Sequence, residues 1–256
     1  TTSQGRLYEV PGIDRPVPSA TNALAMIGKP ALIAWSAKVE REAVVHAAVA
    51  LHCDYVHGGG AVMTGPVYEQ TLLKRLGADK AHTKELEKAG AIGTSVHALI
   101  EWKLRKRLGQ KVGKEPALML EAAPCFAAYQ RWELEAELEA SMVEKTVWSS
   151  EIGFAGTCDF IGTVNLNGKR VMVVGDWKSG KAIYKEALAQ VSAYCAAARE
   201  MGLAPANVPL YGLIVRLPKQ AADPVAEFLF VDEESQKTHL EAFKAALALW
   251  HWSNDC

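Results

Sequence analysis

Two aspartates and a lysine, Asp159, Asp176 and Lys178, stand in or at the end of apolar runs in the second half of the sequence. In the run VVGDWKSG, Asp176 and Lys178 are one residue apart, so on a strand both side chains project from the same face. Two carboxylates close together in a partly dry site repel each other, and such oxygen ligands suit Mg²⁺ or Mn²⁺. Beside that cation, the lysine could orient or deprotonate a water molecule or stabilise the charge of a phosphate.

The flanking residues predict the strands that would bring these groups together. The runs GFAGTCDFIGTVNL and KRVMVVGDWK are rich in β-branched and aromatic residues, and Asn167-Gly168 between them is a strong hairpin signal. Antiparallel pairing across this turn predicts that Asp159 and Asp176 lie at neighbouring positions. Strict alternation along the first strand also places Cys158 and Phe160 together on the face opposite Asp159.

Two pairs of polar residues have helical spacing. His97 and Glu101 are four residues apart in GTSVHALIE, and Gln190 and Tyr194 repeat that spacing after the Asp-x-Lys run. Gly156 completes a G-x-x-D pattern with the first aspartate. Each feature alone has a structural alternative: a surface ion pair for Asp-x-Lys, a structural role for the histidine, and a buried helix face for the glutamine and tyrosine.

The remaining patterns predict an α/β or α+β domain. We expect an extended lead-in over residues 1–20, and then a mainly helical part. Its expected elements are a short helix capped by Ser19 or Thr21 and closed by Gly28, a helix from Pro30 to His52, a loop over 57–66, a short helix over 67–76, a long helix or broken pair over 82–109, and a helix over 116–140. Strands follow at 144–150, 154–166 and 169–178, then a helix over 184–202, strands at 208–218 and 226–232, and a final helix capped by Asp232.

The composition is that of an ordinary globular protein. Of 256 residues, 50% are hydrophobic and 22% are charged, and the formal net charge is -1, so an anionic partner would have to meet a local basic patch. The five cysteines include no CxxC pair, which argues against a disulfide scaffold or a zinc ribbon. We see no apolar run of transmembrane length or secretory leader, and expect no membrane association and a cytoplasmic location, in the host cytoplasm if the protein is phage-encoded.

Four motifs in this order, GTSVHALIE, GFAGTCDF, VVGDWKSG and QVSAY, resemble the PD-(D/E)XK nuclease superfamily. The resemblance covers about residues 90–217 and is to the branch of the RecB nuclease domain and related phage and mitochondrial exonucleases. It implies a restriction-endonuclease-like core, a mixed central sheet flanked by helices. The whole chain, 1–256, would be one nuclease domain, with a helical N-terminal part over about 1–140 and the motif-bearing core over about 90–256.

The resemblance also implies roles for individual residues. A Mg²⁺ or Mn²⁺ ion would be bound by His97, Asp159, Asp176 and the backbone carbonyl of Trp177, and Lys178 would position or activate the attacking water. Glu101 would support the histidine or hold a water on the cation. The DNA backbone would be contacted by Gln190 and Tyr194, with Ser179, Lys181 and Lys185 as further DNA-binding candidates.

Two features of the family stay open or differ in this sequence. The acidic residue that precedes the G-x-x-D strand in the family corresponds to Glu144 or Glu151, of which Glu144 is favoured. Some relatives hold an iron-sulfur cluster with one upstream and three clustered downstream cysteines, but the last two cysteines here are isolated, Cys195 and Cys256. Since such a cluster needs four thiolates, we expect none. No glycine-rich phosphate loop of an ATPase is present either.

The resulting hypothesis is a metal-dependent deoxyribonuclease, most simply an exonuclease that acts on DNA ends or single strands in recombination, repair or phage genome processing. A recombination protein would be a natural partner, and the sequence does not define the oligomeric state. The alternatives are a nicking or structure-specific endonuclease, an inactive nuclease-like DNA-binding module, and an unrelated domain with chance motifs. The basic segment 103–114 could follow a phosphate backbone or simply be a solvated helix end.

Overall fold

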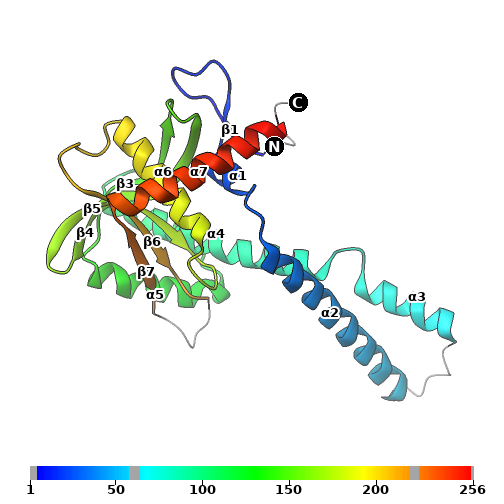
Figure 1. Cartoon of the computed structure of the whole chain (residues 1–256). Helices are drawn as coiled ribbons and strands as arrows, with labels where there is room; N and C mark the ends of the chain where they lie inside the picture. The colour runs from blue at the N-terminus through cyan, green and yellow to red at the C-terminus, as the bar shows by residue number, and fades with distance from the viewer. Residues whose placement is uncertain (1–4, 58–63, 220–224, 255–256) are drawn as a thin grey trace. The chain divides into compact units, whose positions relative to one another are not determined.

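The computed structural model describes residues 5–57, 64–219 and 225–254 of the chain (Figure 1). The chain forms two compact units. The first comprises residues 1–27 and 92–256, and the second comprises residues 28–91. Within the described residues, no helix has the length and hydropathy needed to cross a membrane.

A five-stranded mixed sheet forms the centre of the first unit. Its strands, in the order β3-β4-β5-β6-β7, are Glu139–Ser149, Phe154–Leu166, Lys169–Lys178, Leu210–Arg216 and Glu227–Val231. β5 and β6 are parallel and all other neighbours are antiparallel. The hairpin predicted at Asn167-Gly168 is confirmed: both residues have positive φ, 52° and 79°, as a type I′ turn requires.

Helices cover both faces of this sheet, so the predicted α/β architecture with a mixed, helix-flanked sheet is confirmed (Figure 1). On one face lie α1 (Ala20–Leu24), α6 (Lys185–Glu200) and α7 (Glu233–Asn254), with Phe154, Val174 and Phe243 in their common core. On the other lie α5 (Ala123–Glu135) and the part of α4 (Ala81–Arg107) that belongs to this unit, whose core includes Phe160 and Trp177. Pairing of the strands therefore fixes two separate apolar layers.

The predicted alternation along β4 is wrong at one point. Cys158 packs in the α6 layer but Phe160 packs in the α4 layer, and on β3 Val147 and Val143 divide in the same way. The regular pairing of β3 with β4 includes neither Glu144 nor Asp159, and Glu144 has a φ of 48°. Positive φ at a residue with a side chain twists the strand locally, so both strands exchange faces at this point.

Several predicted boundaries are shifted. The helix expected over 116–140 is the short 3₁₀ turn η1 (Leu120–Ala122) followed by α5, and β3 begins already at Glu139. The segment expected as a long helix or a broken pair is the continuous helix α4. Caps are confirmed at two residues. The Ser19 hydroxyl accepts a hydrogen bond from the backbone N–H of Asn22, and the Asp232 carboxylate accepts one from the backbone N–H of Ser235. Helix α1 ends before Gly28, at Leu24.

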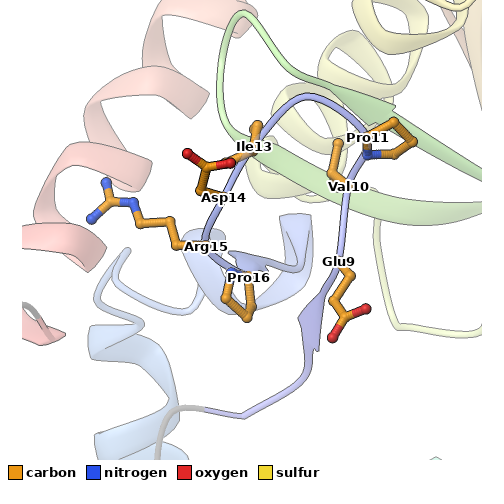
Figure 2. Close-up of a pocket in the computed structure, with 7 residues that line it drawn as sticks. All are labelled: Glu9, Val10, Pro11, Ile13, Asp14, Arg15 and Pro16. Carbon is orange, nitrogen blue, oxygen red and sulfur yellow. The ribbon is translucent and has the colours of Figure 1, made fainter.

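The lead-in to the first unit forms a small hairpin, β1 (Leu7–Tyr8) paired with β2 (Val17–Pro18). The loop between them, Glu9–Pro16, encloses an open hollow (Figure 2). Val10 and Val17 are buried against Ala155 of β4, and a bridge between Ser19 and Ala155 fixes the start of α1 to the sheet.

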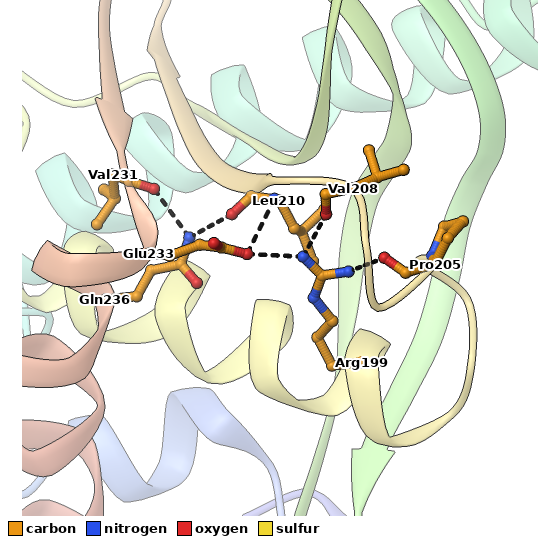
Figure 3. A network of polar contacts seen from close by, with 7 residues as sticks. All are labelled: Arg199, Pro205, Val208, Leu210, Val231, Glu233 and Gln236. Carbon is orange, nitrogen blue, oxygen red and sulfur yellow. Dashed lines mark hydrogen bonds and ion pairs between the residues drawn. The ribbon is translucent and has the colours of Figure 1, made fainter.

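A polar network fastens the turn after α6 to the start of α7 (Figure 3). Arg199 donates to the carbonyl oxygens of Pro205 and Val208 and to Glu233, at 2.7 Å for the last. Gln236 donates to the carbonyl of Leu210 at 2.7 Å. This network closes the crossover between the parallel strands β5 and β6 at the end away from Lys178.

The second unit contains α2 (Pro30–His57), α3 (Gly65–Leu76) and the first part of α4. The helix predicted from Pro30 extends to His57, five residues further than expected. Most of the loop predicted over 57–66 lies outside the described residues.

Candidate active site

Asp176 and Lys178 lie at the carboxyl end of β5, on the face covered by α6. Asp176 is 5% exposed, and its Oδ2 lies 2.6 Å from Nζ of Lys178. Trp177 between them points the opposite way, where its ring stacks on Phe160 with centroids 4.7 Å apart and meets Tyr129 edge-on at 5.3 Å. This aromatic anchor on one face fixes the direction of the aspartate and the lysine on the other.

Asp159 lies where β4 departs from regular pairing, and it meets residues from two other elements. Its Oδ2 accepts a hydrogen bond of 2.5 Å from the backbone N–H of Trp177. Its Oδ1 lies 3.5 Å from Nδ1 of His97, which α4 presents between the buried residues Val96 and Ile100. The structure thus brings together His97, Asp159, Asp176 and Lys178, from three elements.

A chain of hydrogen bonds holds Lys178 from the α6 side. Nζ of Lys178 donates to Oε1 of Gln190 at 2.9 Å, and Nε2 of Gln190 donates to the Tyr194 hydroxyl at 2.9 Å. Tyr194 is 2% exposed. A Cβ atom on Gly156 would stand 2.5 Å from its ring, so only glycine at the first position of G-x-x-D leaves room for this tyrosine. Gln190 and Tyr194 therefore hold the Lys178 side chain in place from the α6 side.

Burial and neighbouring charges shift the pKa values of Asp176, His97 and Lys178. Burial raises the pKa of Asp176, and the charge of Asp159 adds to this while Lys178 opposes it. Burial alone would lower the pKa values of His97 and Lys178, but the nearby aspartates outweigh it and raise both. Lys178 is therefore held as an ammonium ion beside Asp176 in this state.

Glu144 is the acidic group nearest this cluster on β3. Burial raises its pKa to about 7, with the charges of Asp159 and Glu101 and a hydrogen bond to Asp159 as further causes. Its positive φ places it opposite Asp159 at the point where the strands exchange faces. The sequence offered both Glu144 and Glu151 for this position; Glu151 is exposed in the β3–β4 turn.

The donor set fits a cation. Three carboxyl groups, those of Glu144, Asp159 and Asp176, lie here with His97 and Lys178, while the fourth carboxyl group nearby, that of Glu101, is paired with Arg105. Oδ2 of Asp176 is buried and has its ammonium neighbour, but receives no well-directed hydrogen bond. In the part of the chain that the structure describes, no three His, Cys, Asp or Glu side chains are arranged to hold a metal ion as they stand. A cation would therefore compete with Lys178 for Asp176, and the oxygen and imidazole donors present suit Mg²⁺ or Mn²⁺.

The other predicted residues lie around this cluster. Glu101 forms an ion pair with Arg105 at 2.8 Å, one turn along α4 from His97. Lys181 and Lys185 are exposed at the start of the α6 crossover. Ser179 packs against α4, where a Cβ on Gly93 would stand 2.8 Å from its Oγ.

The basic segment is largely engaged within the protein. Lys103 and Arg107 both pair with the buried Glu133 of α5, at 2.6 and 2.8 Å. The ammonium of Lys106 lies over the Trp102 ring. These contacts support the interpretation of this segment as a structural helix end more than as a phosphate track.

No family model and no curated protein matches the chain. Among solved structures, a protein named as a "Putative exonuclease" from Eubacterium rectale matches at 12% identity, over 72% of this chain and 71% of that one, with a TM-score of 0.40. An alkaline exonuclease from Laribacter hongkongensis matches at 16% identity, over 59% of this chain and 79% of that one, with a TM-score of 0.31. Both TM-scores are too low to establish a shared fold.

Proposed function

We propose that this protein is a metal-dependent deoxyribonuclease of the PD-(D/E)XK type, with a restriction-endonuclease-like core, that hydrolyses phosphodiester bonds at DNA ends or in single strands. The observation that carries the proposal is the meeting of His97, Asp159, Asp176 and Lys178, which are up to 81 positions apart in the sequence. Burying carboxylates and an ammonium ion costs folding free energy, and groups perturbed in this way cluster at functional sites. Recombination, repair or phage genome processing would be suitable settings.

The residues that would hold Mg²⁺ or Mn²⁺ are His97, Asp159, Asp176 and the carbonyl of Trp177. When bound, such a cation supplies Lewis-acid stabilisation of the phosphate and a more acidic water. No iron-sulfur cluster is proposed. The charges of Asp159 and Glu101 both act on the neighbouring carboxyl group of Glu144.

Lys178 would act as a positively charged hydrogen-bond donor. Its raised pKa keeps the proton on Nζ, where the ammonium can hydrogen-bond a phosphate oxygen or orient a water for in-line attack. Gln190 fixes the position of Nζ, and Tyr194 fixes Gln190. Because Tyr194 is almost fully buried, we assign this pair a positioning role in place of the predicted direct contact with the DNA backbone.

The phosphate contacts are assigned to the exposed crossover that begins after Lys178. Lys181 and Lys185 can each neutralise a phosphate without breaking an internal ion pair that the structure shows. Ser179 follows Lys178 in the sequence, and its hydroxyl can donate a hydrogen bond to a phosphate of the same DNA strand.

Digestion of end-labelled DNA tests the proposal. Single-stranded, duplex and covalently closed circular DNA would be incubated with Mg²⁺, Mn²⁺ or EDTA, using the wild type, Asp176→Asn, Lys178→Ala and the exposed control Lys169→Ala. We expect cleavage of linear DNA only with a divalent cation, a loss of about 10²-fold or more in both site variants, and no loss in the control. Equal rates in the wild type and both site variants would refute the assignment. Opening of the closed circle would favour the endonuclease alternative.

A further inference from the structure

One exposed aromatic residue lies in the crossover that follows the candidate active site. Tyr184 is 56% exposed, and of the seven tyrosines of the chain, all of which the structure describes, it is the one that is exposed. Among the described residues, its side chain has no hydrogen-bond, ion-pair or ring partner. No polar contact within the fold therefore accounts for a tyrosine at this position.

The residue before it supplies the packing of the crossover. Ile183 is partly buried and packs against Val191 of α6 and Ile214 of β6. Tyr184 follows as the N-cap of α6 with extended backbone, φ -97° and ψ 156°. Because successive side chains of an extended chain point to opposite sides, the inward direction of the isoleucine turns the tyrosine outward.

The ring of Tyr184 lies close to Lys178. A Cβ atom on Gly180 would stand 3.8 Å from Cε2 of the tyrosine, and Gly180 follows the lysine by two residues. Two residues of extended chain span at most about 7 Å, so the edge of the ring lies within roughly 13 Å of the Lys178 backbone. Since a stacked DNA strand advances about 3.4 Å per nucleotide, a strand with its scissile phosphate at Lys178 can reach the ring within a few nucleotides.

The chain around this ring is positively charged. The segment Trp177–Lys185 contains three lysines and no acidic residue, although the formal net charge of the whole chain is -1. Lys181 precedes the tyrosine by three residues and Lys185 follows it directly, and both are exposed. Proteins that bind single-stranded nucleic acid combine cations for the phosphates with an aromatic ring on which a base stacks.

The other exposed aromatic residues of the described chain lack this setting. Phe228 lies on β7 and Trp252 on α7, and neither has a lysine or arginine within three residues in the sequence. The combination of exposed ring, flanking lysines and nearness to Lys178 is therefore particular to Tyr184.

We propose that Tyr184 stacks on the base of an unpaired nucleotide, so that the protein prefers single-stranded DNA or unpaired ends to intact duplex. Within a duplex the faces of each base are covered by the neighbouring pairs, and a protein ring reaches them only after unpairing. The inference rests on the proposed function and narrows its substrate. Lys181 and Lys185 bind phosphates of paired and unpaired strands alike, whereas the tyrosine distinguishes them.

Binding of single-stranded DNA tests this role. A fluorescent oligonucleotide of about 12 nucleotides without self-pairing would be titrated in EDTA with the wild type, Tyr184→Ala, Tyr184→Phe and Trp252→Ala, a control that removes another exposed ring of the same unit. We expect the dissociation constant to rise about 10-fold or more in Tyr184→Ala, and to stay within about 2-fold in Tyr184→Phe and the control. Since the Tyr184 side chain makes no cap hydrogen bond, circular dichroism should show every variant folded.

Two further DNAs separate stacking from a structural or electrostatic role. An oligonucleotide with abasic sites in place of its bases keeps the phosphates but offers nothing to stack, so the wild type and Tyr184→Ala should bind it equally. A relaxed, covalently closed circular duplex, added as competitor, should also bind both proteins with affinities within about 2-fold. If Tyr184→Ala loses the same affinity for all three DNAs, or loses none, the proposal is wrong.

The same measurements distinguish this inference from the proposed function. A wild type that binds none of these DNAs, and cleaves none with Mg²⁺, would refute both. A wild type that cleaves linear DNA, with a Tyr184→Ala variant that binds and cleaves single strands equally well, would leave the nuclease assignment in place and refute the stacking role.

Discussion

Replacing Glu144 by Gln should stabilise the metal-free protein at neutral and alkaline pH. In the native structure burial and the charges of Asp159 and Glu101 raise the pKa of Glu144 to about 7, from the ordinary value of 4.5. Between these two values the folded state keeps a proton that the unfolded state has released. Stability therefore falls as pH rises through this window, and the loss is complete above pH 7.

The size of the effect follows from the shift. A difference of this size corresponds to roughly 3 kcal/mol, and because the side chain is only partly buried we reduce it to about 1–2 kcal/mol. Glutamine fills the same volume and carries no charge at any pH. The variant should match the wild type near pH 4.5 and exceed its free energy of unfolding by about 1–2 kcal/mol at pH 8.

Urea unfolding in EDTA at intervals from pH 4.5 to 8 measures this difference. Glu151→Gln, which changes an exposed carboxyl in the β3–β4 turn, is the matched control and should follow the wild type at every pH. If Glu144→Gln keeps the pH dependence of the wild type, the pKa of Glu144 is not raised by burial and neighbouring charges, and this account of the site is wrong.

Three further substitutions test the packing around the site. Gly156→Ala should lower the free energy of unfolding by about 1–3 kcal/mol in thermal or urea unfolding, because its Cβ would stand 2.5 Å from Tyr194, whereas Gly180→Ala, with no contact closer than 3.5 Å, should be tolerated. Gln190→Leu should reduce kcat about 10-fold or more with little change in KM, since it removes the hydrogen bond that holds the lysine; a purely structural role would instead lower stability and leave kcat intact. Glu133→Leu should lower the free energy of unfolding by about 1–3 kcal/mol in urea unfolding, because it leaves the buried Tyr129 hydroxyl without its acceptor and removes the partner of Lys103 and Arg107; an unchanged unfolding midpoint would contradict this interpretation.

Local sequence signals predicted most of the fold. The turn at Asn167-Gly168 and the caps at Ser19 and Asp232 are formed by residues a few positions apart, and the structure confirms all three. The exchange of faces at Glu144 and Asp159 could not be predicted. Nothing in the sequence marks a glutamate for positive φ, and the change is imposed by the neighbouring strand and by packing on both sides of the sheet.

The sequence predicted which residues form the site better than it predicted the hydrogen bonds between them. Alternation on β5 and the register of the hairpin indicated that Asp159 and Asp176 would lie close together. The hydrogen bonds from Lys178 through Gln190 to Tyr194, and the fit of Tyr194 against Gly156, depend on how α6 crosses the sheet. A spacing of four residues gives only the shared helix face, so it could not distinguish a contact with DNA from a contact with the lysine.

Anomalous scattering from a crystal soaked in Mn²⁺ tests the central claim most directly. The account predicts a manganese peak bound by Asp159, Asp176 and His97, with Nζ of Lys178 displaced from Asp176 but still close by, and no peak in Asp176→Asn. A peak elsewhere, or wild-type crystals in which Lys178 and Asp176 stay paired without bound manganese, would contradict it.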